Sequence, residues 1–397
     1  MEFPLLSFFL AGGAEAAKIP LAMLVVFGSA KLLAELFEKI GQPGIVGEIF
    51  AGMIIGPSVL NIIQPDDFLT ALADLGVMFL LFRVGLEVKS SELMRVGGTA
   101  LLVAILGVAV PFLLGYGILL AWGAPQIEAI FVGAAMVATS VGITAQVLAA
   151  KGLLQHTASK IILAAAVIDD VLGLIVLAIV SSMAKGSVNV MEISLTAILA
   201  IGFTILVAKW GTRTMGKLVP TMQSRLQAGE VQFNLAMVLL FGLSLLAIYT
   251  GVAAIIGAFL AGMALAESVG HRVHDLAHGV TELLVPFFLA GIGLHLDLTA
   301  FKDPSVMVLA GIILIAAIFS KLVGCGLGGY SLGWANMFRI GSGMVPRGEV
   351  GMVVAQIGLG LKVIPAEIYG VVVFMAVATT LAAPPLLNAA FRHAKKT

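Results

Sequence analysis

The chain has 397 residues, of which 60% are hydrophobic and only 11% are charged, and its mean hydropathy is +1.12. A soluble domain carries about 25% charged residues, so this composition excludes a soluble protein and indicates a polytopic membrane protein. Lys plus Arg equals Asp plus Glu at 22 each, and a formal net charge of zero gives no indication of a nucleic-acid partner.

Apolar runs separated by charged residues and by Gly/Pro clusters predict about thirteen transmembrane helices in an all-α fold. The predicted spans cover residues 18–38, 44–62, 68–87, 97–121, 126–150, 157–184, 191–209, 230–249, 252–268, 279–296, 305–328, 338–360 and 366–390. The single cysteine, Cys325, lies inside one of these runs, so a disulfide within the chain is impossible.

The basic residues are distributed unevenly between the two sides of this predicted topology. Fourteen Lys and Arg residues fall on one side, and only Lys18, Lys185, Lys302 and Lys362 fall on the other. Cytoplasmic loops carry an excess of basic residues. We therefore expect a multi-pass membrane protein whose N-terminus is outside and whose C-terminus is cytoplasmic.

Three motifs recur at a nearly constant offset of 208 to 210 residues: GEIFAGM as GAFLAGM, FLLFRVGLEV as FFLAGIGLHL, and AMVATSVG as GMVPRGEVG. Each offset equals seven predicted spans. Because seven is odd, matched helices run in opposite directions across the bilayer. We predict two inverted six-helix repeats, residues 18–184 and 230–390, joined by a linker helix at 191–209. Repeats of this kind are typical of secondary transporters.

Two adjacent carboxylates, Asp169 and Asp170, lie inside the apolar run 157–184. An ionised carboxylate at the centre of a bilayer costs about 2.5–3.5 kcal/mol on insertion scales, so the pair requires a cation, a proton or a buried base. Neighbours on a helix point about 100° apart, so one acid can face a pathway while the other faces a partner helix. A purely structural ion pair is the alternative, but one Asp would suffice for it.

Two spans carry residues that weaken a helix at matching depths. In VATSVGITAQ, residues 137–146, Gly142 and the hydroxyls of Thr139, Ser140 and Thr144 offer backbone freedom and rival hydrogen bonds. In the matching segment MVPRGEVGM, Pro346 removes a backbone donor. We predict two broken helices, interrupted near Gly142 and Pro346, that cross beside the acid pair. Continuous Gly-rich packing helices are the alternative.

Further charges lie within the predicted spans. Lys321 needs a carboxylate partner or must be neutral, and one of the two aspartates is the natural partner. Arg347 and Glu349 share the broken span 338–360 and are predicted to compensate the exposed helix ends. The six histidines fall at or beyond span ends and are not spaced as buried metal ligands. No Walker or other Gly-rich phosphate loop follows a strand, so we expect no cofactor, no nucleotide and no enzyme activity.

The segments AAVIDDVLGL, VATSVGITAQ, MVPRGEVGM and FRVGLE together resemble the cation:proton antiporter-2 family, and within it the NapA-type sodium/proton antiporters. The resemblance covers essentially the whole chain. It implies a homodimer in the bacterial cytoplasmic membrane, with a mobile core domain around 97–184 and 305–390 and a dimerisation domain made of the remaining helices. It also implies that Asp170 binds the transported Na⁺ and the proton, that Asp169 pairs with Lys321, and that Thr139 and Ser140 line the site.

The expected function is secondary antiport of Na⁺ (or Li⁺) for H⁺ by alternating access. If Lys321 supplies a second proton, the exchange is electrogenic. Exchange of K⁺ for H⁺ on the same scaffold remains an alternative, because the sequence does not separate the ion preferences of one carboxylate site. A sodium-coupled organic-solute symporter, which would need polar side chains around a substrate cavity, and a non-transporting sensor or channel are the other readings.

Overall fold

The computed structural model describes residues 14–392 of the chain except 41, 43, 89, 185–189, 226–229, 251, 297–300 and 302. Over these residues the chain forms helices joined by turns and irregular segments, without strands. It divides into two compact units, Met1–Gly76 with Leu284–Asp297, and Val77–Leu283 with Leu298–Thr397. The two aspartates and the two broken spans belong to the second unit.

The first unit consists of α2 (Ala14–Lys39), α3 (Gly44–Ile55), the beginning of α4 (Asp67–Leu86) and the end of α12 (His271–Leu294). Its helices approach closely where a side chain is missing, as at Gly52, where a Cβ would collide with the backbone of Ala290. One cluster of its buried apolar residues comprises Val26, Ile55, Ile63, Leu69, Phe287, Ala290 and Leu294.

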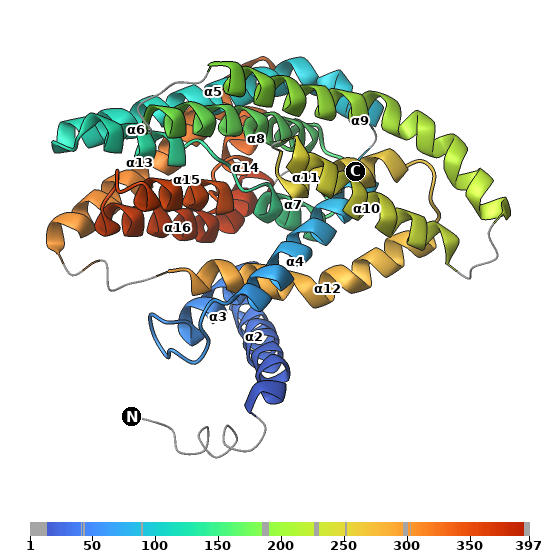
Figure 1. The fold of residues 1–397 in the computed structure, drawn as a ribbon, viewed down its shortest axis with the longest axis horizontal. Helices are drawn as coiled ribbons and strands as arrows, with labels where there is room; N and C mark the ends of the chain where they lie inside the picture. Colours follow the sequence, from blue (N-terminus) through green and yellow to red (C-terminus); the bar gives the residue numbers. More distant parts are fainter. Residues whose placement is uncertain are drawn as a thin grey trace. The chain divides into compact units, whose positions relative to one another are not determined.

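The second unit contains the rest of α4 and α12 together with the remaining helices (Figure 1). Those helices are α5 (Ser90–Trp122), α6 (Gln126–Ala135), α7 (Val141–Ala150), α8 (Thr157–Ala184), α9 (Val190–Arg225), α10 (Val231–Tyr249), α11 (Ala254–Leu265), α13 (Pro304–Gly328), α14 (Trp334–Gly343), α15 (Glu349–Gly360) and α16 (Ala366–Ala390), with a short 3-10 helix at Tyr330–Leu332. The helix α13 shows how such an element starts, because the Asp303 carboxylate accepts from the Ser305 N–H at 2.8 Å and Pro304 occupies the first turn.

Among the described residues, eight helices are long and apolar enough to cross a membrane: α2, α4, α5, α8, α10, α12, α13 and α16. Shorter apolar helical stretches form α3, α6, α7, α11, residues 197–207 of α9 and residues 351–360 of α15. The predicted all-helical membrane fold is confirmed, whereas the number of about thirteen spans stays a prediction.

The helix α9 differs from the predicted linker of residues 191–209, because it continues to Arg225. The hydropathy of the sequence falls where the basic residues Lys209, Arg213 and Lys217 begin. Hydropathy therefore locates the edge of the apolar run, which covers residues 197–207, and not the end of the helix. Helix formation does not require apolar side chains, so the helix continues beyond that edge.

Close glycine contacts recur at the offset of the predicted repeat. Within the first unit, Gly47 faces the backbone of Leu33. Within the second unit, Gly257 faces the backbone of Leu243, and each of these two residues comes 210 positions after its counterpart in the first contact. Gly293 against Ile49 and Gly85 against Phe259 form a second matched pair of contacts, each inside one unit. Two sequence repeats with one packing plan would produce this pattern, and the inverted repeat itself stays a prediction.

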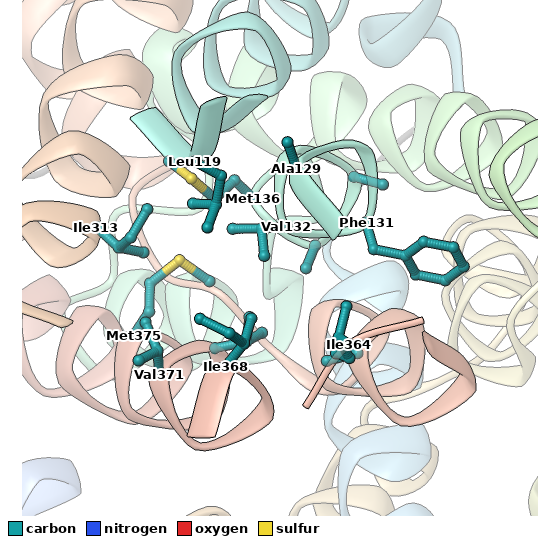
Figure 2. Close-up of a cluster of buried hydrophobic side chains, with 14 of the residues drawn as sticks. Leu119, Ala129, Phe131, Val132, Met136, Ile313, Ile364, Ile368, Val371 and Met375 are labelled. Carbon is teal, nitrogen blue, oxygen red and sulfur yellow. The ribbon is translucent and has the colours of Figure 1, made fainter. Parts of the chain in front are cut away.

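An apolar cluster in the second unit holds the first broken span in place (Figure 2). Met136, the residue that follows α6, is fully buried in this cluster. The cluster therefore fixes the end of α6 against α5, α13 and α16, next to the point where the helix stops. The residues drawn in Figure 2 include Leu119 of α5, Ala129, Phe131 and Val132 of α6, Ile313 of α13, Ile364, and Ile368, Val371 and Met375 of α16.

Candidate functional site

Both broken spans are interrupted in the structure. The chain leaves helical structure between Ala135 and Val141 in the first span, and between Gly343 and Glu349 in the second. Pro346 lies inside the second interruption, as predicted. The first interruption comes earlier than predicted, because Gly142 lies in the first turn of α7 and the non-helical residues are 136–140. A glycine is tolerated within a helix, whereas hydroxyl residues and tertiary contacts decide where this one ends.

The two interrupted segments contact each other directly. The Ser140 N–H donates to the Pro346 carbonyl at 2.7 Å, and the Thr144 hydroxyl donates to the Gly343 carbonyl at 2.6 Å. A Cβ at Gly348 would lie 2.8 Å from the Cβ of Ser140, so a glycine is needed for this approach. Backbone groups that a continuous helix would have paired internally are thus satisfied between the two segments.

Arg347 is completely buried beside the end of the first half-helix. Its Nη1 donates to the carbonyls of Val137 and Ala138 at 3.2 and 3.3 Å, and its Nη2 donates to the carbonyl of Ala317 at 3.1 Å. The carbonyl end of a helix carries partial negative charge. The guanidinium therefore lies where it compensates the freed carbonyls after α6. The side chain of Glu349, predicted to share this role, lies outside the described part of the structure, although its backbone begins α15.

Two threonines of α16 hold the backbone of the second interruption. The Arg347 N–H donates to the Thr379 hydroxyl at 3.1 Å, and the Thr380 hydroxyl donates to the Arg347 carbonyl at 2.8 Å. We did not predict these residues from the sequence. The available signal was a pair of adjacent hydroxyls in an otherwise apolar span, which is consistent both with packing and with a site.

Lys321 of α13 and Asp169 of α8 form an ion pair inside the second unit. The ammonium nitrogen lies 3.2 Å from Oδ2 and 3.4 Å from Oδ1, and both side chains are 0% exposed. Taking two charges out of water is expensive, so such a pair is weak evidence for stability but strong evidence for a constrained site. The structure thus pairs Lys321 with Asp169, 152 residues apart in the chain.

Asp170 is buried to 4% exposure and follows Asp169 on α8, so it points about 100° away from the ion pair. The helix α8 packs against α6, α7 and α15, which carry the ends of both interruptions. Thr139 and Ser140, in the first interruption, are also buried, and the Thr139 hydroxyl has no hydrogen-bond partner among the described residues.

The assembled site contains two carboxylates and two cationic side chains, with hydroxyl and carbonyl oxygens nearby. Oxygen donors of this kind suit hard cations, and a carboxylate also accepts a proton. Among the described residues, no group of three or more His, Cys, Asp or Glu side chains could hold a resident metal ion. The oxygen atoms of this arrangement are chemically able to hold a cation or a proton.

The family model for the transmembrane region of the sodium/hydrogen exchanger matches residues 22–392. The chain belongs to the sodium/hydrogen exchanger family. The members of this family are secondary transporters and not enzymes. The resemblance to cation:proton antiporters noted from the sequence is confirmed by this match and by the relatives that follow.

The chain is 34% identical to the high-affinity Na⁺/H⁺ antiporter NhaS3 of Synechocystis sp., over 96% of this chain and 91% of that protein. It is 32% identical to the Na⁺/H⁺-K⁺ antiporter GerN of Bacillus cereus, over 91% of this chain and 94% of that protein. Among solved structures it resembles the sodium proton antiporter MjNhaP1 of Methanocaldococcus jannaschii, with a TM-score of 0.67, 19% identity, and coverage of 94% of this chain and 96% of that one. The last similarity shows the fold alone.

Proposed function

We propose that this protein exports Na⁺, or Li⁺, in exchange for H⁺ by secondary active antiport. The observation that carries the proposal is the buried pair of Asp169 and Lys321 next to a second buried carboxylate, Asp170, on a helix that packs against both broken spans. Charged side chains are energetically costly within a membrane, and proteins keep them there where ions or protons pass. The names of the relatives NhaS3 and GerN add support for Na⁺ and H⁺ as the exchanged ions.

Asp170 is the residue at which the two ions compete in this proposal. A protonated carboxyl group cannot offer a full negative charge to Na⁺, so one carboxylate binds either a proton or the cation. The hydroxyl of Thr139 supplies an additional oxygen, because it is buried without a hydrogen-bond partner in the described part of the chain. Ser140 lies in the same interruption and, in this proposal, lines the ion site together with Thr139.

Lys321 makes the exchange electrogenic in this proposal. The ammonium pairs with Asp169 while protons are bound and releases its proton when Na⁺ arrives, because a second cation repels it. Two protons then enter for each Na⁺ that leaves. One net charge is worth about 2.3 kcal/mol per 100 mV, so the membrane potential adds to the driving force. A transport rate that ignores a valinomycin-set potential would refute this two-proton scheme.

The exchange takes place by alternating access, with residues 97–184 and 305–390 as the mobile core domain and the other helices as the dimerisation domain of a homodimer. The bilayer is the bacterial cytoplasmic membrane, with the N-terminus outside and the C-terminus in the cytoplasm. The matched glycine contacts support the inverted repeats on which alternating access is based.

A second candidate is exchange of K⁺ for H⁺ at the same carboxylate. It is favoured by one observation, the similarity to GerN, whose name includes K⁺. The oxygen donors of the site accept either ion, so direct measurement decides between them.

The test uses the full chain in liposomes that contain a pH-sensitive dye, with Na⁺, Li⁺ and K⁺ added in turn. We expect Na⁺ and Li⁺ to drive proton flux and Asp170→Asn to abolish it while the variant remains folded in detergent. Flux driven by K⁺ alone would replace the leading proposal by the second candidate. Flux at the wild-type rate in Asp170→Asn would remove this carboxylate from the mechanism.

A further inference from the structure

One face of α13 packs closely against α5 at positions where glycines take the place of side chains. Lys321, Gly324, Cys325 and Gly328 are spaced i, i+3, i+4 and i+7, so they lie on a single face of the helix. A Cβ at Gly324 would lie 2.9 Å from a backbone oxygen of α5, and one at Gly328 would lie 2.6 Å from the Cα of Val103. Small residues of this kind allow close helix contact within membranes.

Gly107 is the residue of α5 that faces this contact at the level of the ion pair. A Cβ added there would lie 2.7 Å from the Cys325 sulfur, 3.3 Å from the Lys321 Nζ and 3.9 Å from the Asp169 Oδ1. The first distance is too short for real atoms and the second is tight. The backbone of α5 therefore covers the ion pair, and only a glycine leaves room for it.

We infer that Gly107 is a positioning residue for the exchange: by letting α5 approach α13, it holds Lys321 against Asp169 and so sets how strongly this pair competes with Na⁺. The inference rests on the proposed antiport. In this account Gly107 contacts neither Na⁺ nor the transported proton, because its effect is exerted through Cys325 and Lys321.

The expected size of the effect follows from the geometry of the pair. At an effective dielectric constant of about 20, opening a 3.2 Å ion pair by about 1 Å weakens the attraction enough to change an equilibrium roughly tenfold. If the lysine is held less firmly on Asp169, Na⁺ meets a weaker competitor. A methyl group at position 107 should then lower the Na⁺ concentration for half-maximal transport by roughly threefold to tenfold. General damage to the fold would raise this concentration or lower the maximal rate instead.

The experiment compares wild type, Gly107→Ala, Cys325→Ala and the double variant in liposomes, with proton flux recorded over a series of Na⁺ concentrations at one pH. Gly117→Ala is the matched control, because Gly117 lies on the same helix and a Cβ there would meet no atom within 4 Å. Thermal midpoints in detergent report folding. In the double variant the nearest obstructing atom, the Cys325 sulfur, is gone.

We expect Gly107→Ala to lower the half-saturating Na⁺ concentration, Gly117→Ala to leave it unchanged, and the double variant to return toward the value of Cys325→Ala. If Gly107→Ala does not fold, recovery of folding in the double variant supports the same steric coupling. The inference is overturned if Gly107→Ala has the same half-saturating Na⁺ concentration as the wild type. It is also overturned if the value of the double variant lies no closer to that of Cys325→Ala than the value of Gly107→Ala lies to that of the wild type. Absence of Na⁺-driven flux in the wild type would instead refute the proposed antiport, and would be seen before any variant is compared.

Discussion

Asp169 and Asp170 are neighbours in the chain but have different surroundings. Asp169 of α8 pairs with Lys321 of α13, whereas Asp170 points about 100° away on α8. The sequence carried enough information to expect one acid to pair with Lys321, because an isolated ammonium within a membrane requires a carboxylate. It did not indicate Thr379 and Thr380, since their role depends on the position of the Arg347 backbone, which only the folded structure defines.

The ion pair predicts a specific pattern of stability. Removing one member of a buried pair leaves an uncompensated charge and costs about 3–5 kcal/mol, whereas removing both members costs much less. Both side chains are fully buried here. Asp169→Asn and Lys321→Gln should therefore each lower the thermal midpoint in detergent strongly, and the double variant should recover most of the loss. Losses that simply add would show that the two groups are not energetically coupled.

At the scale of helices, the two interruptions were predictable because proline, glycine and clustered hydroxyls weaken a helix locally. Their positions were predicted unequally well. Pro346 marks its interruption directly, since it cannot complete the helical hydrogen-bond pattern. Gly142 does not mark the other, because the end of α6 is set by the burial of Met136 and by the bond from Ser140 to Pro346, which are tertiary contacts.

The start of α8 contains a titratable cap. The Nδ1 of His156 accepts a hydrogen bond from the Ala158 N–H at 3.1 Å. The His156 ring lies edge-on to the Phe391 ring, with 5.5 Å between the ring centroids. Burial, and then the positive charge of Arg339, lower the pKa of His156 below its usual value of 6.5. The folded state thus favours neutral His156. Its contribution to stability is fully present above about pH 6.5 and is lost as the pH falls through the lower folded pKa.

We therefore expect the thermal midpoint of the wild type to fall, as the pH is lowered from about 6.5, more steeply than that of His156→Asn. Asn at this position keeps a cap for the helix but does not titrate. Protonated His156 loses the acceptor at Nδ1 and places a cation at the start of a helix, where positive charge is unfavourable. Equal slopes for the two proteins would exclude His156 as the titrating group.

At the scale of the whole molecule, composition was sufficient for the membrane class, and the motifs were sufficient for the family. A charged fraction of 11% and a mean hydropathy of +1.12 leave no soluble alternative. The close approach of α5 to α13 at Gly107 could not be predicted, because the sequence contains 46 glycines and does not indicate which of them faces another backbone.

The central claim is that Na⁺ and the proton share Asp170, and the dependence of Na⁺ affinity on pH tests it most directly. The measurement is the Na⁺ concentration for half-maximal proton flux in liposomes, taken at a series of pH values for the wild type. If the two ions compete for one carboxylate, this concentration rises as the pH falls below the apparent pKa of the site, approaching at least about tenfold for each pH unit. A half-saturating Na⁺ concentration that stays constant across the working pH range would contradict a shared site.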